Sequence, residues 1–369
     1  RYDFTSLKEI KIICKVDGIA QNIEADIPPH GAGVIYIPIN TNAKEVYIAF
    51  IDPRGFVANE EKISLQKNEL QTANVKLNVT LTENDAAYFV TQGDVQYDIS
   101  KLTGIIVSAR KGEQQILKQG PVFGIVPMND DDGGKPNVAG ETYQNNIYPL
   151  KNYPLYTLFA KNIAAQQTSE GIKINMDVIY KDATGKQSYL FANDGKVITQ
   201  YEVQYKGADT LPYQYGLMMQ LPKTFDKLRF KRKGSFTVYP ENDIARDEGT
   251  AMLNAKHANG VEEWGAPKGD WKDDANDLGS NDFRSTKRNI LNASLVDADG
   301  NKIVIVSEGK QASRTWLQDE SINWLIADYS NNGSEPFYGS PFTNGRVRIK
   351  NKRLKGRLVF RIDEYKNVT

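Results

Sequence analysis

The stretch ASLVDADGNKIVIVS, residues 293–307, decides the fold class of this 369-residue chain. Apolar runs of strand length lie on both sides of Asp299-Gly300, and Asp-Gly supplies the positive φ angles that a tight hairpin turn requires. A calcium loop at Asp297 and Asp299 is the alternative, but the later ligands of such a loop are missing from the pattern. We therefore predict two antiparallel strands joined by a plain turn.

The same signals recur outward from this hairpin. Apolar and polar residues alternate over short runs, which is the period of a half-buried strand, at residues 34–38, 46–50, 172–178, 347–349 and 358–362. Further turn signals lie at Asp17-Gly18, Asp194-Gly195 and Asn344-Gly345. Helical periodicity is nearly absent, so the sequence predicts an all-β fold.

The length favours about two domains. We expect a small immunoglobulin-like β-sandwich over residues 1–74 and one large antiparallel supersandwich over residues 75–369. Residues 254–282 are rich in Gly, Asp, Lys and Trp and lack any periodicity. We interpret them as a long surface excursion and a candidate binding element.

Composition excludes several classes of function. Lys plus Arg equals Asp plus Glu at 46 each, so no net charge attracts nucleic acid or an anionic membrane, and no apolar run is long enough to span a bilayer. With one cysteine and two histidines we expect no internal disulfide, no metal site and no cofactor. Cys14 is predicted to be a buried thiol, and His30 and His257 to be turn or surface residues.

Three landmarks follow one another along the second predicted domain. The first is residues 90–134, in which the matching positions are Gly104, Leu117, Gly120, Pro121, Pro127 and the acidic run 129–132. The second is LRFKRKGSFTVYPENDIAR, residues 228–246, with Phe230, Gly234, Tyr239, Pro240, Asp243 and Arg246. The third is residues 337–362, with Tyr338 and Gly339. In this order the three landmarks resemble the C-terminal sandwich of glycoside hydrolase family 2 β-galactosidases, in which Tyr338 and Gly339 would take the Trp-Gly positions. The resemblance implies a galactose-mutarotase-like fold for residues 75–369.

The resemblance implies a parent enzyme that hydrolyses β-linked galactosides or related glycans with two glutamates. In that family both glutamates stand on a (β/α)₈ barrel, which takes roughly 250 residues of alternating strand and helix. This chain has neither the pattern nor the room for a barrel beside the sandwiches. We therefore expect a non-catalytic portion that shapes the sugar pocket, packs on the catalytic barrel and is a candidate for homo-oligomer contacts.

Candidate carbohydrate-binding residues follow from the need for aromatic faces flanked by planar polar groups. Trp264 and Trp271 lie in EEWGAPKGDWKDDAND, residues 262–277, and either contact a ligand or another domain, or anchor this loop. By the family register Tyr338 stacks on the sugar, although a plain loop aromatic is the alternative. Tyr239, Asp243 and Arg246 either contact the ligand or brace a turn through an ion pair. Trp316 and Trp324 lie among apolar residues, so we expect them in the core.

Two rival functions stay open. One is a free-standing carbohydrate-binding β-sandwich that holds glycan through Trp264 and Trp271. The other is a sandwich enzyme of mutarotase or lyase type, which the shortage of histidines makes the least favoured. Because the chain begins at Arg1, we expect a processed protein or a piece of a longer one. A glycan-degrading role favours a periplasmic or extracellular location, while a single unpaired cysteine also suits the cytoplasm.

Overall fold

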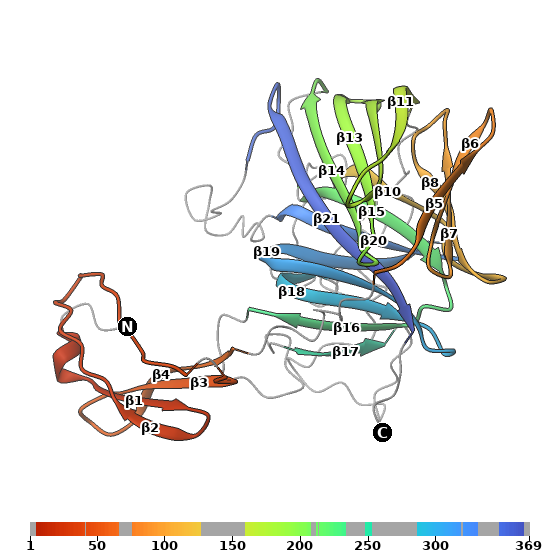
Figure 1. Ribbon diagram of the computed structural model, residues 1–369. Coiled ribbons are helices and arrows are strands. Elements are labelled where there is room, and N and C mark those ends of the chain that lie inside the picture. The colour runs from red at the N-terminus through yellow and green to blue at the C-terminus, as the bar shows by residue number, and fades with distance from the viewer. Residues whose placement is uncertain are drawn as a thin grey trace, which may run out of the picture. The chain divides into compact units, whose positions relative to one another are not determined.

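The computed structural model describes residues 5–40, 42–65, 76–126, 159–207, 212, 214–233, 248–252, 286–318, 320–330 and 347–364. The chain divides into two compact units, Arg1–Ala73 and Asn74–Thr369 (Figure 1). Each unit is described by itself below.

The first unit contains a short 3₁₀ helix, η1 (Leu7–Glu9), and one antiparallel sheet with the strand order β2-β1-β3-β4. Its strands are β1 (Lys11–Val16), β2 (Ile19–Asn22), β3 (Glu45–Ile51) and β4 (Val57–Ser64). Asp17 and Gly18 join β1 to β2 with positive φ angles, and Cys14, Val16 and Val46 form the core. The immunoglobulin-like topology stays a prediction, because the described residues of this unit form a single sheet.

The prediction of a strand over residues 34–38 is wrong. Residues 23–40 are described and form no strand, and the side chains of Val34 and Tyr36 are exposed. Pro38 lies inside the apparent alternation and has no amide hydrogen for a strand partner. Apolar and polar residues therefore alternate over 34–38 although this segment pairs with no neighbouring strand.

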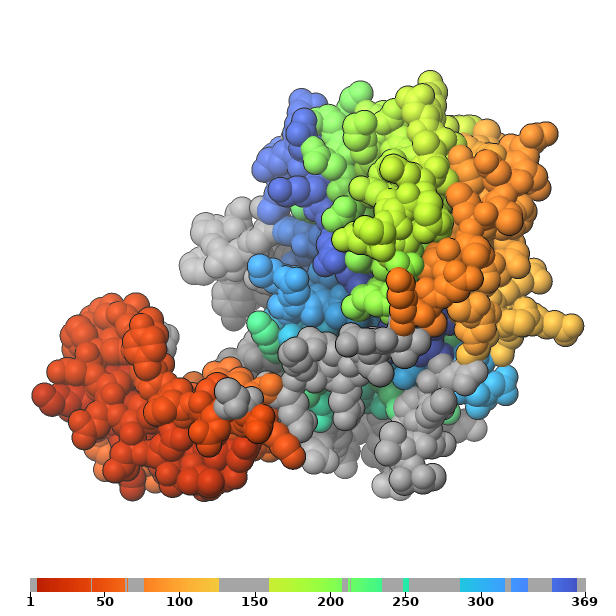
Figure 2. All heavy atoms as spheres, in the orientation of Figure 1, coloured from red at the N-terminus to blue at the C-terminus, as the bar shows by residue number. Residues whose placement is uncertain are grey.

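The described residues of the second unit form two antiparallel sheets. The smaller sheet has the order β5-β6-β7-β8-β9, with β5 (Val79–Glu83), β6 (Ala87–Gln92), β7 (Val95–Ser100), β8 (Ile106–Lys111) and β9 (Gln114–Leu117). Figure 2 shows these orange strands meeting the yellow-green strands of the larger sheet in one continuous surface. The two sheets also share one apolar core, in which Tyr97 of the smaller sheet packs against Phe191 of the larger one.

In the part of the chain that the structure describes, the larger sheet has twelve strands. Nine of them follow the order β10-β15-β20-β19-β21-β14-β13-β12-β11, and β18, β16 and β17 branch from β19. Their bounds are β10 (Gln119–Val126), β11 (Phe159–Gln167), β12 (Gly171–Ile179), β13 (Ala183–Ala192), β14 (Val197–Tyr205), β15 (Gln214–Pro222), β16 (Lys227–Arg232), β17 (Glu248–Met252), β18 (Thr286–Val296), β19 (Asn301–Gln318), β20 (Ser321–Ser330) and β21 (Arg353–Glu364). Figure 1 shows β13, β14 and β21 turned steeply against β18 and β19, so the sheet is strongly twisted.

The sequence-based prediction of an all-β fold with a large antiparallel sandwich is confirmed. Strand β12 buries Ile172, Ile174, Met176 and Val178, the residues that the alternation placed on one face. The hairpin over residues 293–307 is also present, because β18 pairs with β19 and Gly300 adopts φ 86° between them. The side chain of Asp297 accepts the backbone N–H of Asn301 at 2.8 Å, which braces the turn.

The structure describes part of the first landmark, residues 90–134. Leu117 is fully buried, and the Gly120-Pro121 peptide bond is cis. Gly120 has φ 109°, and a Cβ on it would lie 2.9 Å from the Cα of Met219 on β15. Only glycine therefore fits this crossing of two strands. Pro127 and the acidic run 129–132 lie outside the described residues.

Candidate functional site

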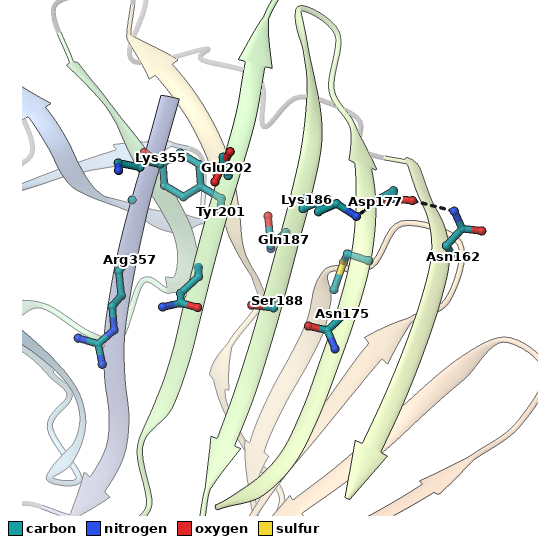
Figure 3. A pocket seen from close by; sticks show the side chains of 13 residues that line it. Asn162, Asn175, Asp177, Lys186, Gln187, Ser188, Tyr201, Glu202, Lys355 and Arg357 are labelled. Carbon is teal, nitrogen blue, oxygen red and sulfur yellow. Dashed lines mark hydrogen bonds and ion pairs between the residues drawn. The ribbon is translucent and has the colours of Figure 1, made fainter. Parts of the chain in front are cut away.

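A hollow of about 820 Å³ lies on one face of five neighbouring strands, β11, β12, β13, β14 and β21. Figure 3 shows polar side chains of these strands gathered along it. We call this site the polar hollow, and its lining residues are Asn162, Asn175, Met176, Asp177, Lys186, Gln187, Ser188, Gln200, Tyr201, Glu202, Lys355, Gly356 and Arg357. Its volume falls in the range of ligand-binding clefts.

Strand register brings eight polar residues together on this face. Residues directly opposite each other on neighbouring strands share a face of the sheet. Two rows of cross-strand partners therefore cross the hollow from β12 to β21. One row is Asn175, Ser188, Gln200 and Arg357, and the other is Asp177, Lys186, Glu202 and Lys355.

Asp177 is held as an anion at one end of the hollow. Its carboxylate accepts hydrogen bonds from Asn162 Nδ2 at 2.7 Å and from Lys186 Nζ at 3.2 Å (Figure 3). The bond from Asn162, with that from Lys186, lowers the pKa of Asp177 below its ordinary value. A β-bulge in β11 between Lys161 and Ala164 carries Asn162, whose positive φ of 51° suits an asparagine. Asp177 is therefore an acceptor of hydrogen bonds at neutral pH.

The other end of the hollow carries surplus positive charge. Glu202 is paired with Arg353, with 2.9 Å between Oε1 and Nη1. Lys355 and Arg357 lie on the same face of β21, and both are exposed. Within the part of the chain that the structure describes, neither of these two side chains forms an ion pair or a hydrogen bond. Two cations on β21 are thus available to a ligand.

A partly buried carboxyl, that of Asp328, lies behind this end of the hollow. Tyr201 borders the hollow but is buried between the exposed residues Gln200 and Glu202 of β14, and it donates its hydroxyl hydrogen to Asp328 Oδ2 at 2.7 Å. Gln311 Nε2 donates to Asp328 Oδ1 and to the backbone oxygen of Arg357, each at 2.8 Å. Burial raises the pKa of Asp328 to about 6, although its hydrogen bonds act in the other direction. The backbone of Arg357 is therefore fixed from behind by a polar network.

The six carbohydrate-binding residues predicted from the sequence have no described geometry. They all lie outside the described residues, namely Tyr239, Asp243, Arg246, Trp264, Trp271 and Tyr338. The excursion over residues 254–282 and His257 lie there as well. Their roles stay predictions.

Other sequence-based predictions are confirmed. Trp324 is fully buried and donates from Nε1 to Ser313 Oγ at 2.8 Å, so it is a core residue; the side chain of Trp316 lies outside the described set. Cys14 is buried, and His30 is an exposed turn residue with φ 57°.

Metal clusters and membrane-spanning helices are both absent from the described ranges. No cluster of three or more His, Cys, Asp or Glu residues with the geometry to hold a metal ion occurs there. Among the same residues, no helix has the length and apolar character that a membrane crossing would need.

Sequence reasoning missed the polar hollow. The available signal was the polar half of each alternating strand, for instance Asn175 and Asp177 between buried residues of β12. Polar positions of this kind usually face solvent and carry no function. Only the register of four strands, which the sequence does not specify, brings them into one site.

Comparisons with known proteins give the following matches. Residues 91–250 match the family model described as beta galactosidase small chain. The chain is similar in structure to a putative aldose 1-epimerase from Escherichia coli K12, with 9% identity, a TM-score of 0.40 and coverage of 78% of this chain and 100% of that one. It is also similar to galactose 1-epimerase from Lactobacillus acidophilus, with 8% identity, a TM-score of 0.39 and coverage of 79% and 99%. No curated protein matches the sequence.

Proposed function

We propose that this chain is the non-catalytic, sugar-binding sandwich portion of a β-galactosidase-type glycoside hydrolase. The observation that carries the proposal is the match of residues 91–250 to the beta galactosidase small chain. This range includes most of the first landmark and all of the second, which the sequence had related to the same kind of enzyme. The third landmark, residues 337–362, lies beyond the match.

The polar hollow supports binding rather than proton transfer. A retaining or inverting glycosidase needs one carboxyl that is protonated at the working pH. The two carboxylates of the hollow, Asp177 and Glu202, are instead paired with Lys186 and Arg353. Carboxylates paired with cations can accept hydrogen bonds from sugar hydroxyls, and the amides of Asn175 and Gln200 can both donate and accept.

In this proposal a catalytic barrel is the partner of the chain and supplies both glutamates. The sandwich shapes the rim of the sugar pocket, with Tyr338 and the loop carrying Trp264 and Trp271 as its aromatic contacts. Tyr239, Asp243 and Arg246 support the rim, homo-oligomer contacts are a further role, and the location is periplasmic or extracellular.

The test is a calorimetric titration of the full chain with lactose, comparing the Trp264→Ala/Trp271→Ala double variant with the parent. Loss of binding in the double variant is expected, because stacking on an aromatic face contributes much of the affinity. Tyr36→Ala is the matched control, since Tyr36 is an exposed aromatic of the first unit. If the parent chain does not bind lactose, the proposal is refuted.

If the chain is instead a free-standing carbohydrate-binding protein, the same titration result is expected. The reading frame upstream of the codon for Arg1 separates the two. A (β/α)₈ barrel encoded in that frame supports the enzyme portion, whereas a signal peptide directly before Arg1 favours the free-standing protein. A sandwich enzyme of mutarotase type would accelerate the change in optical rotation of fresh α-galactose, and we expect no acceleration.

A further inference from the structure

The charges in the polar hollow balance at one end only. Asp177 has Lys186 as its cation, and Glu202 has Arg353. Lys355 and Arg357 are left over within the described residues, and they stand two positions apart on β21. Side chains with this spacing on one strand lie about 7 Å apart.

The position of Arg357 is fixed by the groups behind it. Gln311 Nε2 donates to its backbone oxygen at 2.8 Å, and the Asp328 carboxylate accepts its backbone N–H. Arg357 stands opposite Gln200 on β14. A guanidinium presents a planar fork that matches the two oxygens of a carboxylate or a sulfate.

The other polar side chains that line the hollow are either uncharged or held in ion pairs. Asn175 and Ser188 continue the row from Gln200, and each can bind a sugar hydroxyl. Four strands at the usual spacing span about 14 Å, which leaves room for a short oligosaccharide. A ligand that suits this floor carries hydroxyls along most of its length and an acidic group at one end.

We propose that the polar hollow binds an acidic oligosaccharide, whose carboxylate or sulfate is held by Lys355 and Arg357. This inference rests on the proposed function, because it takes the ligand to be a saccharide. It goes further by naming the chemical class of the ligand and the two residues that select it.

The test is calorimetric titration of the full chain at about 20 mM and about 200 mM salt. The probes are trigalacturonate, a sulfated galactose trisaccharide, a neutral β-linked galactose trisaccharide and inorganic sulfate. At low salt at least one acidic trisaccharide is expected to bind about tenfold more tightly than the neutral one, and this advantage shrinks at high salt. Which acidic probe binds more tightly identifies the acidic group.

Variants of Lys355 and Arg357 test whether these two residues cause the tighter binding of the acidic trisaccharide. Lys355→Gln/Arg357→Gln removes two charges from the hollow and is expected to abolish the tenfold advantage. Arg357→Lys keeps the charge but loses the fork, so it retains part of the advantage. Lys206→Gln/Lys310→Gln, two exposed positions outside the hollow, is expected to behave like the parent chain.

Three results would overturn the inference. They are equal affinity for neutral and acidic probes, an unchanged advantage in Lys355→Gln/Arg357→Gln, and inorganic sulfate binding as tightly as the sulfated sugar. If neutral galactosides still bind in these cases, the proposed function survives without the acidic ligand. If no saccharide binds to the parent chain, both proposals fail.

Discussion

The Tyr201 hydroxyl on β14 donates a hydrogen bond to Asp328 Oδ2 on β20, with 2.7 Å between the two oxygens. These strands are not neighbours, because β19 and β21 lie between them in the sheet. Gln311 on β19 donates to the other oxygen of Asp328 and to the backbone oxygen of Arg357 on β21. The partly buried carboxyl of Asp328 therefore links four consecutive strands behind the polar hollow.

The ionisation of Asp328 predicts a loss of stability as the pH rises. Burial raises its folded-state pKa to about 6, above the ordinary value of 3.8, so the folded chain holds this proton more tightly than the unfolded chain. The contribution is fully present below about pH 4 and is lost as the pH rises through 6. The shift corresponds to about 3 kcal/mol of unfolding free energy.

Asp328→Asn provides the comparison, because an amide has a similar shape and does not titrate. Urea denaturation at several values between pH 4 and pH 7.5 should give a shallower decline with pH in the variant than in the parent. Asp363, whose pKa burial also raises, is unchanged in both proteins and cancels in the difference. Identical pH slopes for the two proteins would show that Asp328 does not carry the effect.

Gly356→Ala should destabilise the second unit by about 1–3 kcal/mol through overpacking. A Cβ at this position would collide with Asp328 Oδ2 and would lie 2.6 Å from Cε1 of Tyr201. In an Asp328→Ala background the carboxyl is gone, so the same substitution should cost less. A double-mutant cycle from urea denaturation measures this coupling, and strictly additive losses would contradict it.

Tyr180→Phe should cost about 1–3 kcal/mol of unfolding free energy. The Tyr180 hydroxyl accepts the backbone N–H of Phe123 at 3.2 Å and donates to Gln187 Oε1 at 2.7 Å, and all three residues are buried. Removing one oxygen therefore leaves a donor and an acceptor without partners. Tyr36→Phe is the control, because Tyr36 is 85% exposed and its loss should be within about 0.5 kcal/mol. Equal losses in the two variants would count against the network.

Most strands of the second unit could be predicted from the sequence where burial on one face produced alternation. Residues 347–349 are an exception, because they alternate and bury Ile349 but form no strand. Leu358 and Phe360 are buried as their spacing indicated, and Asp299-Gly300 forms the expected turn. The failure at Val34 and Tyr36 has a physical cause, because alternation reports burial only when a neighbouring strand pairs with the segment. Pro38 could not contribute to such pairing.

The candidate site could not be predicted because it depends on contacts between distant parts of the chain. Arg357 and Ser188 share one row only because β21 returns to pair with β14 after more than a hundred residues. The role of Asp328 could not be predicted from the sequence for a related reason. Asp328 follows six buried residues of β20, and such a run indicates core packing. The hydrogen-bond partners of Asp328, Tyr201 and Gln311, lie on other strands.

The rate of hydrolysis of ortho-nitrophenyl β-galactoside by the purified chain tests the central claim most directly. The chain should be produced in a host that lacks a β-galactosidase of its own, and lactose binding should be measured on the same preparation. We predict lactose binding together with a hydrolysis rate equal to that of buffer. A hydrolysis rate that rises in proportion to the concentration of the chain, and saturates with substrate, would contradict the account.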